Sequence, residues 1–151
     1  MFKILSAARP IGSSDRVFFK LVLLWSVLMA GADEQLIYAA EKGDLQMARC
    51  AIEAGARVDA SKEYNKRTPL FLASAHGHTD IVRLLIDQGA DVSLKDVNGD
   101  NPLHDCGNID IAGILIDRGV KIDVQNYVGI TPLISMAVSY THLTLPTNRE
   151  V

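Results

Sequence analysis

Residues 68–92 read TPLFLASAHGHTDIVRLLIDQGADV, and the same order of elements recurs along the chain. A second copy begins at Asn101-Pro102-Leu103 and closes with Gly119-Val120-Lys121-Ile122, and a third begins at Thr131-Pro132-Leu133. A degenerate earlier copy runs from residue 35 to residue 58. Self-similarity with a period of about 20–50 residues indicates a stack of like supersecondary units. The repeats therefore predict an all-α solenoid built from helix–turn–helix pairs with hairpin tips.

The residue types at positions 68–92 account for where each of two helices begins, ends and is buried. Thr68 supplies an oxygen that can cap a helix, and Pro69 is tolerated in the first turn because its missing N–H would have no partner there. Gly77 can take a positive φ and end that helix. The apolar run 81–86 then predicts a short second helix that is buried on most sides. One unit cannot bury these faces alone, so neighbouring units must stack.

The spacing between copies locates an insertion and a deletion. Leu36, Leu70, Leu103 and Leu133 are separated by 34, 33 and 30 residues. The extra residue falls in the tip 63–67, which lacks the glycine of later tips, and Asn65 is the expected substitute in a left-handed conformation. The deletion falls between Cys106 and Asp110, where it removes the last turn of a first helix. We expect that unit to be the most weakly packed.

These motifs resemble the ankyrin repeat, with its Thr-Pro-Leu-His-like helix opening, Gly-His turn, Ile-Val-x-Leu-Leu second helix and Gly-Ala-Asp-Val exit. The resemblance covers residues 33–137, divided as 33–63, 64–96, 97–126 and a partial unit at 127–137. It implies about three repeats plus a truncated fourth. It also implies a binding scaffold rather than an enzyme, with no cofactor.

The first 32 residues lie outside the repeats. Lys3, Arg9, Arg16 and Lys20 precede a short apolar run, and Ala30-Gly31-Ala32 follows it. A basic region, an apolar core and an Ala-x-Ala exit are typical of a secretory signal peptide. The run is shorter than the roughly 20 residues that span a bilayer. We expect export, to the periplasm or outside the cell; the alternative is an apolar helix that caps the first repeat.

The last residues also depart from the pattern. Residues 138–147 resemble one reading frame of a transposon-derived sequencing adapter, and Pro146 stands where Arg83 lies within a second helix, at a cost of about 3 kcal/mol. We expect residues 138–151 to be a non-native tail, with a natural polar tail as the alternative. A truncated fourth repeat would then leave Ile111, Ile114 and Leu115 uncovered.

Charge narrows the class of partner. Residues 33–137 hold ten basic and sixteen acidic residues, a net charge of −6. An acidic body disfavours nucleic acid and anionic lipid, which attract clustered Lys and Arg. We expect a protein partner, a monomeric array and no membrane insertion once the signal peptide is removed.

Several residues resemble chemical sites without completing one. Asp96-Val97-Asn98-Gly99-Asp100 places oxygens as a calcium loop does, but Asn101 and Gly107 stand where such a loop needs Gly and Glu. His76 and His78 lack a third metal ligand. His104, Asp105 and Cys106 are consecutive, so on a helix they point in different directions. We predict no metal site, no catalytic residue and no phosphate loop.

The two cysteines are expected to stay reduced. Cys50 aligns with a second-helix core position, and Cys106 aligns with Ala73 in a first helix two repeats away. Repeats stack about 10 Å apart, beyond the Cα separation of about 7 Å that a disulfide tolerates. Both cysteines are therefore expected to be small buried apolar groups.

The family resemblance places the binding surface on the hairpin tips and on the exposed side of the first helices. Carried over position by position, that surface consists of Tyr64, Asn65, Arg67, Ala75, His76, Val97, Asn98, Asp100, Asp105, Tyr127, Val128 and Ile130. Tyrosine and arginine are the types that dominate interface energetics. Two other hypotheses stay open: a targeting module of a larger enzyme, and a cytosolic or host-directed ankyrin effector whose leader is misread.

Overall fold

The computed structural model describes residues 17, 20–21, 25 and 31–136 of the chain. Its helices are α3 (Ala32–Lys42), α4 (Leu45–Glu53), α5 (Pro69–His76), α6 (Thr79–Asp87) and α7 (Ile109–Asp117). Residues 132–136 are helical as well. Within these described ranges there is no strand. The predicted all-α solenoid is confirmed.

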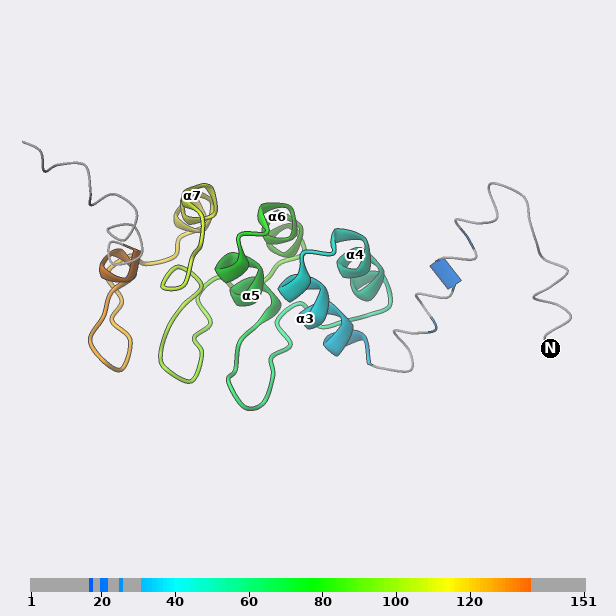
Figure 1. Cartoon of the computed structure of the whole chain (residues 1–151), viewed down its shortest axis with the longest axis horizontal. Helices are drawn as coiled ribbons and strands as arrows, with labels where there is room; N and C mark the ends of the chain where they lie inside the picture. Colours follow the sequence, from blue (N-terminus) through cyan, green and yellow to red (C-terminus); the bar gives the residue numbers. More distant parts are fainter. Residues whose placement is uncertain (1–16, 18–19, 22–24, 26–30, 137–151) are drawn as a thin grey trace, which may run out of the picture.

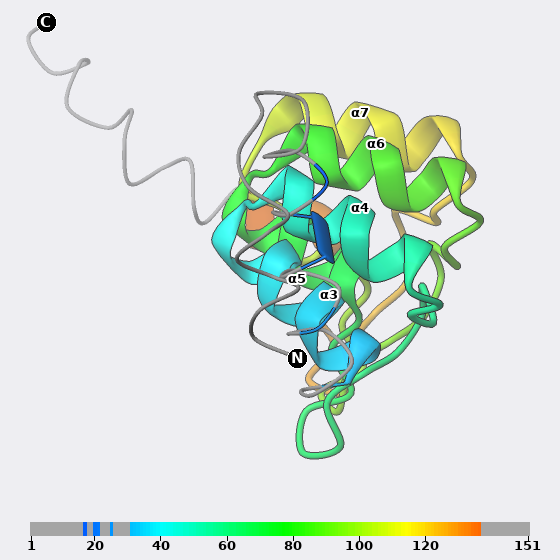
Figure 2. The same ribbon diagram turned by 90° about the vertical axis from the view of Figure 1, so that its right-hand side faces the viewer.

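The helices form two rows. In Figure 1, α4, α6 and α7 lie in one row, α3 and α5 lie in a second row beside it, and the hairpin loops project from the opposite side. Figure 2 shows α4, α6 and α7 next to one another with similar axis directions. Contacts run from α3 to both α4 and α5, from α5 to α6, and from α6 to α7. Among the described helices, the main contacts therefore join neighbouring units, as a solenoid requires.

Helix termini follow the predicted signals. The Oγ1 atom of Thr68 accepts a hydrogen bond from the backbone nitrogen of Phe71 (3.2 Å), and Pro69 is the first helical residue. Gly77 ends α5 with φ 79°, in the left-handed region that a side chain would strain. Asp44 caps α4 in the same manner as Thr68, by accepting from the nitrogen of Met47 (2.9 Å).

The core is a continuous seam of equivalent positions. Leu36, Leu70 and Leu103, one from each first-helix position, are at most 1% exposed. Ile81, Val82, Leu85 and Ile86 of α6 are buried as predicted, and burying such a side chain contributes about 1.5–3 kcal/mol. Ala73 and Ser74 are also fully buried, so α5 approaches its neighbours through small side chains.

The deletion removes more helix than predicted. Residues 102–105 form turns, and no first helix exists in that unit. The shortened segment instead docks against α5, because the backbone nitrogen of Gly107 donates to the carbonyl oxygen of Ser74 (3.0 Å). A side chain at Gly107 would place its Cβ 2.8 Å from the carbonyl oxygen of Ala75. The glycine thus permits a close backbone approach.

Three local expectations are wrong. Lys66, not Asn65, has the positive φ in the first tip (55°), because Lys66 is the residue in register with Gly99. Ile111 and Leu115 are fully buried rather than uncovered, and Met136 is among the side chains that pack against the core. Cys50 is only half-buried, whereas Cys106 is buried; both are free thiols, as predicted.

Two expectations fall almost wholly outside the described residues. The signal peptide was assigned to residues 1–32, of which only 17, 20–21, 25, 31 and 32 are described. Lys20 forms an ion pair with Glu53 (3.1 Å). The adapter-like tail at 138–151 lies beyond the described ranges.

Candidate functional site

Neighbouring hairpin tips are joined by main-chain hydrogen bonds. The nitrogen of Val97 donates to the carbonyl oxygen of Asn65 (3.1 Å), and the nitrogen of Tyr127 donates to the carbonyl oxygen of Asn98 (3.0 Å). Tyr64, Val97 and Tyr127 occupy equivalent positions in successive tips. The bonds therefore hold the three tips side by side along one edge of the stack (Figure 1).

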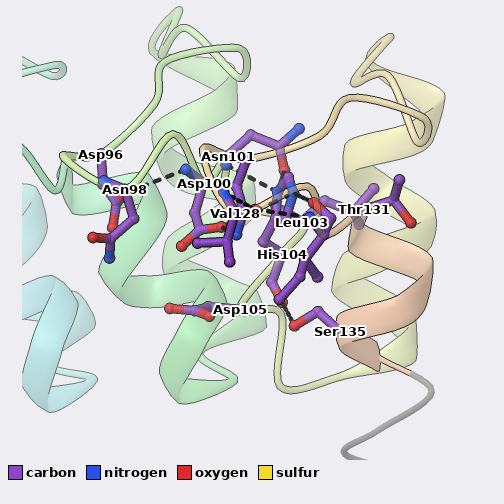
Figure 3. A network of polar contacts seen from close by, with 12 residues as sticks. Asp96, Asn98, Asp100, Asn101, Leu103, His104, Asp105, Val128, Thr131 and Ser135 are labelled. Carbon is purple, nitrogen blue, oxygen red and sulfur yellow. Dashed lines mark hydrogen bonds and ion pairs between the residues drawn. The ribbon is translucent and has the colours of Figure 1, made fainter.

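The second and third tips are each organised by one buried or half-buried polar side chain. The Oδ1 atom of Asp96 accepts from the nitrogens of Asn98 (2.8 Å) and Asp100 (3.1 Å). Asn126 does the same in the next tip, for Val128 (3.0 Å) and Ile130 (2.8 Å). Of the side chains that resembled a calcium loop, Asp96 thus bonds the backbone of its own turn (Figure 3), and Asp100 accepts from the Nδ2 of Asn126 in the next tip (2.8 Å).

The first tip is organised differently. Glu63 stands where Asp96 and Asn126 stand in the other tips. Asn65 provides the local contact instead, since its Oδ1 accepts from the nitrogen of Arg67 (3.0 Å). Lys66 then adopts the left-handed conformation described above, which costs a residue with a side chain about 1–2 kcal/mol. This tip is the strained member of the set.

Arg67 connects the first tip to the second and to its own helix. Its guanidinium contacts the carboxylates of Asp96 (3.2 Å) and Asp105 (3.0 Å). It also lies over the ring of Phe71, 4.6 Å from the centroid, in a cation–π arrangement. The Asp96 side chain is 0% exposed, so Arg67 provides the cation that this buried carboxylate needs.

His104 connects the second tip to the third. Its Nε2 donates to the carbonyl oxygen of Ile130 (3.0 Å), and its Nδ1 lies 3.1 Å from the backbone nitrogen of Asn101. Ser135 adds a bond from its hydroxyl to the carbonyl oxygen of His104 (2.6 Å). Figure 3 shows these groups converging between the two tips. His104 is buried and held by backbone, as expected of a structural histidine.

The predicted surface residues divide into two groups. Tyr64, Tyr127 and Val128 are 74%, 78% and 76% exposed, and Val97, Asn98 and Ile130 are exposed as well. Asn65, Arg67, Ala75, Asp100 and Asp105 are half-buried; the side chains of Arg67, Asp100 and Asp105 contact neighbouring segments, and that of Asn65 contacts its own tip. The exposed group can meet a partner directly, whereas the half-buried group holds the tips in place.

On the helix side, Asp105 contacts Arg67 of the first tip (3.0 Å), whereas His76 lies at the C-terminal end of α5. His76 is exposed at the end of α5 and stacks on His78, with ring centroids 6.0 Å apart. His78 itself lies against Gly43 and contacts the carbonyl oxygen of Glu41 through Nε2 (3.3 Å). The ring of His78 therefore joins the turn of one unit to the turn of the next.

The sequence reasoning missed a groove in the first unit. It lies between α3 and the tip at 60–64, with a volume of about 740 Å³. Its polar lining includes Asp33, Glu34, Glu41, Lys62 and Glu63, together with the rings of Tyr38 and Tyr64. The signal was available: Glu41 is in register with Ala75, a position already assigned to the concave face.

Two ion pairs shape this groove. Arg57 donates to Asp33 from its backbone nitrogen (2.7 Å) and from Nε (2.8 Å), and the backbone bond is the main cause that lowers the pKa of Asp33. Lys62 donates to Glu41 (3.1 Å), which lowers the pKa of Glu41 and raises that of Lys62. The tip is thereby tied to the helix it faces.

Comparison with known proteins identifies the repeat. The family described as ankyrin repeats (three copies) matches residues 36–126, more than half of the chain. The chain belongs to the ankyrin-repeat family. Ankyrin repeats are generally protein-interaction modules and are generally non-catalytic.

Curated relatives of this ankyrin chain are larger proteins. It is 36% identical to the probable E3 ubiquitin-protein ligase XBOS32 of Oryza sativa subsp. japonica, over 49% of this chain and 15% of that protein. It is 36% identical to the serine/threonine-protein kinase VIK of Arabidopsis thaliana, over 46% of this chain and 16% of that one. It is 31% identical to the ankyrin repeat-containing protein P1E11.10 of Schizosaccharomyces pombe, over 45% and 32%. The chain thus spans less than a third of each.

Within the described part of the chain, no cluster of three or more His, Cys, Asp and Glu side chains is arranged to hold a metal ion. The same described residues contain no helix of the length and apolar character needed to cross a bilayer.

Proposed function

We propose that this ankyrin chain is a non-enzymatic scaffold that binds a partner protein through its hairpin tips and the concave face of its first helices. The row of exposed side chains on hydrogen-bonded tips carries the proposal. Tyr64, Val97, Tyr127 and Val128 are exposed, and the backbone nitrogens of Val97 and Tyr127 are hydrogen-bonded to the preceding tip. Binding through such a row orders little additional chain, so little entropy is lost.

The composition of the row favours a protein partner. Tyrosine contributes large, rigid contact area with few rotatable bonds and is enriched in binding hot spots. Val128 and Ile130 add apolar area to the Tyr127 tip. The array carries a net charge of −6 over residues 33–137, and such a charge opposes nucleic acid. We propose a single copy of the array bound to a basic or neutral protein surface.

The test compares two matched double variants of the full chain. Tyr127→Ser with Val128→Ser removes exposed apolar area at the third tip, and Ile109→Ser with Ile116→Ser removes it from α7, away from the tips. The full chain and both variants are used to capture proteins from the source organism, and the captured proteins are quantified by mass spectrometry. The specific partner should be lost with the tip variant only. Equal loss in both variants, or retention by the tip variant, would refute tip binding.

A second candidate is a targeting module of a larger enzyme. The relatives named as an E3 ubiquitin-protein ligase and a protein kinase favour it, because the chain matches only 15–16% of each. The repeats would then deliver a catalytic domain to the bound protein. The complete genomic reading frame decides between the two: a catalytic domain in that frame supports the targeting module, and its absence supports the stand-alone scaffold.

We further propose that the chain is exported, to the periplasm or outside the cell. The basic, apolar and Ala-x-Ala order of residues 1–32 supports this. A reporter that is active only after export, fused behind residues 1–40, should be active. A silent reporter would favour a cytosolic or host-directed ankyrin protein instead.

A further inference from the structure

We infer that the groove between α3 and the first tip binds a peptide segment that presents a Lys or Arg side chain between apolar residues. This inference deepens the proposed function, on which it rests, by assigning a chemical class to one part of the partner. It adds Glu34, Tyr38 and Glu63 to the surface.

The groove is a shaped space. Its volume of about 740 Å³ lies between the exposed side of α3 and the tip residues that face it. Ile37 and Ala60 form the buried floor, and the rings of Tyr38 and Tyr64 lie on the rim with 51% and 74% of their surface exposed. Pockets that bind small molecules usually have volumes of about 300–1,000 Å³. The groove can therefore receive one long side chain with its neighbours.

The charges of the lining are not balanced. Four carboxylates, from Asp33, Glu34, Glu41 and Glu63, face two cations, from Arg57 and Lys62. Both cations already contact a carboxylate: Arg57 with Asp33 and Lys62 with Glu41. Glu34 and Glu63 form no ion pair within the described residues, and both are exposed. The lining thus carries two more negative than positive charges, and the ammonium of Lys42 beside Tyr38 reduces the local excess to one; this excess attracts a cation and repels an acidic segment.

The aromatic rim is suited to the same ligand. The ammonium of Lys42 already lies 5.8 Å from the centroid of the Tyr38 ring, so that ring accepts a cation over its face. Tyr64 presents a second ring across the groove. A guanidinium is attracted both to such rings and to carboxylates. Apolar residues beside the basic one would then cover the floor at Ile37 and Ala60.

The experiment selects peptides without presuming their sequence. A phage library of random short peptides is panned on the full chain, and enriched peptides are synthesised with a fluorescein label for anisotropy. We expect Lys or Arg with apolar flanks to be enriched. Replacing that basic residue by citrulline or norleucine should weaken binding by about tenfold.

Two charge variants localise the binding. Glu34→Gln with Glu63→Gln removes the unbalanced charges while keeping side-chain shape, and we expect binding to weaken about three- to tenfold. Asp117→Asn with Asp123→Asn makes the same change in net charge at exposed positions outside the groove, and we expect an effect of less than about twofold. Tyr38→Ser should weaken binding as well.

Several results would overturn the inference. The first is a selection in which Lys and Arg are not enriched among the peptides, and the second is equal weakening of peptide binding by both charge variants. The third is peptide binding that appears only after Lys3, Arg9 and Arg16 are changed to Gln, which would assign the groove to the chain's own basic residues. A concentration-dependent dimer broken by the Glu34→Gln, Glu63→Gln variant would assign it to a second copy. If the Tyr127 tip variant loses its protein partner and the Glu34→Gln, Glu63→Gln variant keeps all of its binding, the proposed function stands while this inference fails. If the groove binds basic peptides but the tips capture no protein partner, this inference stands while the proposed function fails.

Discussion

The guanidinium of Arg67 lies 3.0 Å from the carboxylate of Asp105, a residue 38 positions further along the chain. The same guanidinium contacts Asp96, which organises the second tip through two backbone nitrogens. One side chain at the first tip thus fixes the conformation of the next one. This relationship gives Arg67 a structural role in the surface, in addition to the binding role that the family resemblance implied.

Removing Arg67 should destabilise the array. In Arg67→Ala, the carboxylate of Asp96 stays buried without its cation, so we expect a loss of about 2–3 kcal/mol in the free energy of unfolding. Urea denaturation measures this value. Arg83→Ala, an exposed arginine on α6, should cost less than about 0.5 kcal/mol. Similar losses in the two variants would contradict the assigned role.

We expect the contribution of Asp105 to the free energy of unfolding to fall as pH rises, whereas that of a typical paired carboxylate increases. Burial raises the pKa of Asp105, and Arg67 only partly opposes that effect. A group with a raised pKa in the folded state contributes stability below its unfolded pKa and loses that contribution as pH rises through the folded pKa. Asp105→Asn should therefore gain stability relative to the natural chain as pH rises from 3.8, the ordinary pKa of an aspartate, toward neutrality. Urea titrations at a series of pH values test the sign, and a relative loss on raising pH would show it to be wrong.

The strained lysine offers a stabilising substitution. Lys66 has φ 55°, and glycine avoids the steric cost of about 1–2 kcal/mol there but loses more chain entropy. We expect Lys66→Gly to raise the free energy of unfolding by about 0.5–1 kcal/mol. Lys66→Ala keeps the Cβ and should bring no gain. If alanine stabilised the chain as much as glycine, backbone strain would not be the cause.

Two glycines predict opposite responses to alanine. At Gly107 a Cβ would lie 2.8 Å from a backbone oxygen, so Gly107→Ala should destabilise the chain by about 1–3 kcal/mol. Gly113 lies within α7 and its Cβ would meet nothing within 4 Å. Gly113→Ala should therefore stabilise by about 0.5–1 kcal/mol. Thermal melts of both variants provide the comparison, and a shift of equal sign would contradict the docking of residue 107 on α5.

Repeat architecture was predictable because its signals are local. Thr68, Pro69 and Gly77 act within one helix, and the period of the leucines fixes which faces must be buried. The conformation of the first tip was not predictable from residue type, because Lys66 takes the left-handed position through its register with Gly99. Burial of Ile111 and Leu115 depends on how the residues after the third tip pack, and a sequence pattern does not specify that packing.

The surface was harder to predict than the fold. Equivalent positions in other repeats located the exposed side chains Tyr64, Val97 and Tyr127. They could not show that Arg67, Asp100 and Asp105 contact neighbouring segments, since those contacts join residues more than 25 positions apart. The groove beside Tyr38 is lined by α3 and by the first tip together, so the register of Glu41 with Ala75 indicated one wall of the groove but not the space between the two walls.

The central claim is that the row of hairpin tips meets the partner protein. Site-specific photo-cross-linking tests it most directly, with benzoylphenylalanine at position 127 on a tip or at position 116 on α7, both exposed in the natural chain. We predict one discrete adduct with a partner protein from position 127 and none from position 116. An adduct from position 116 alone, or equal adducts from both positions, would contradict the account.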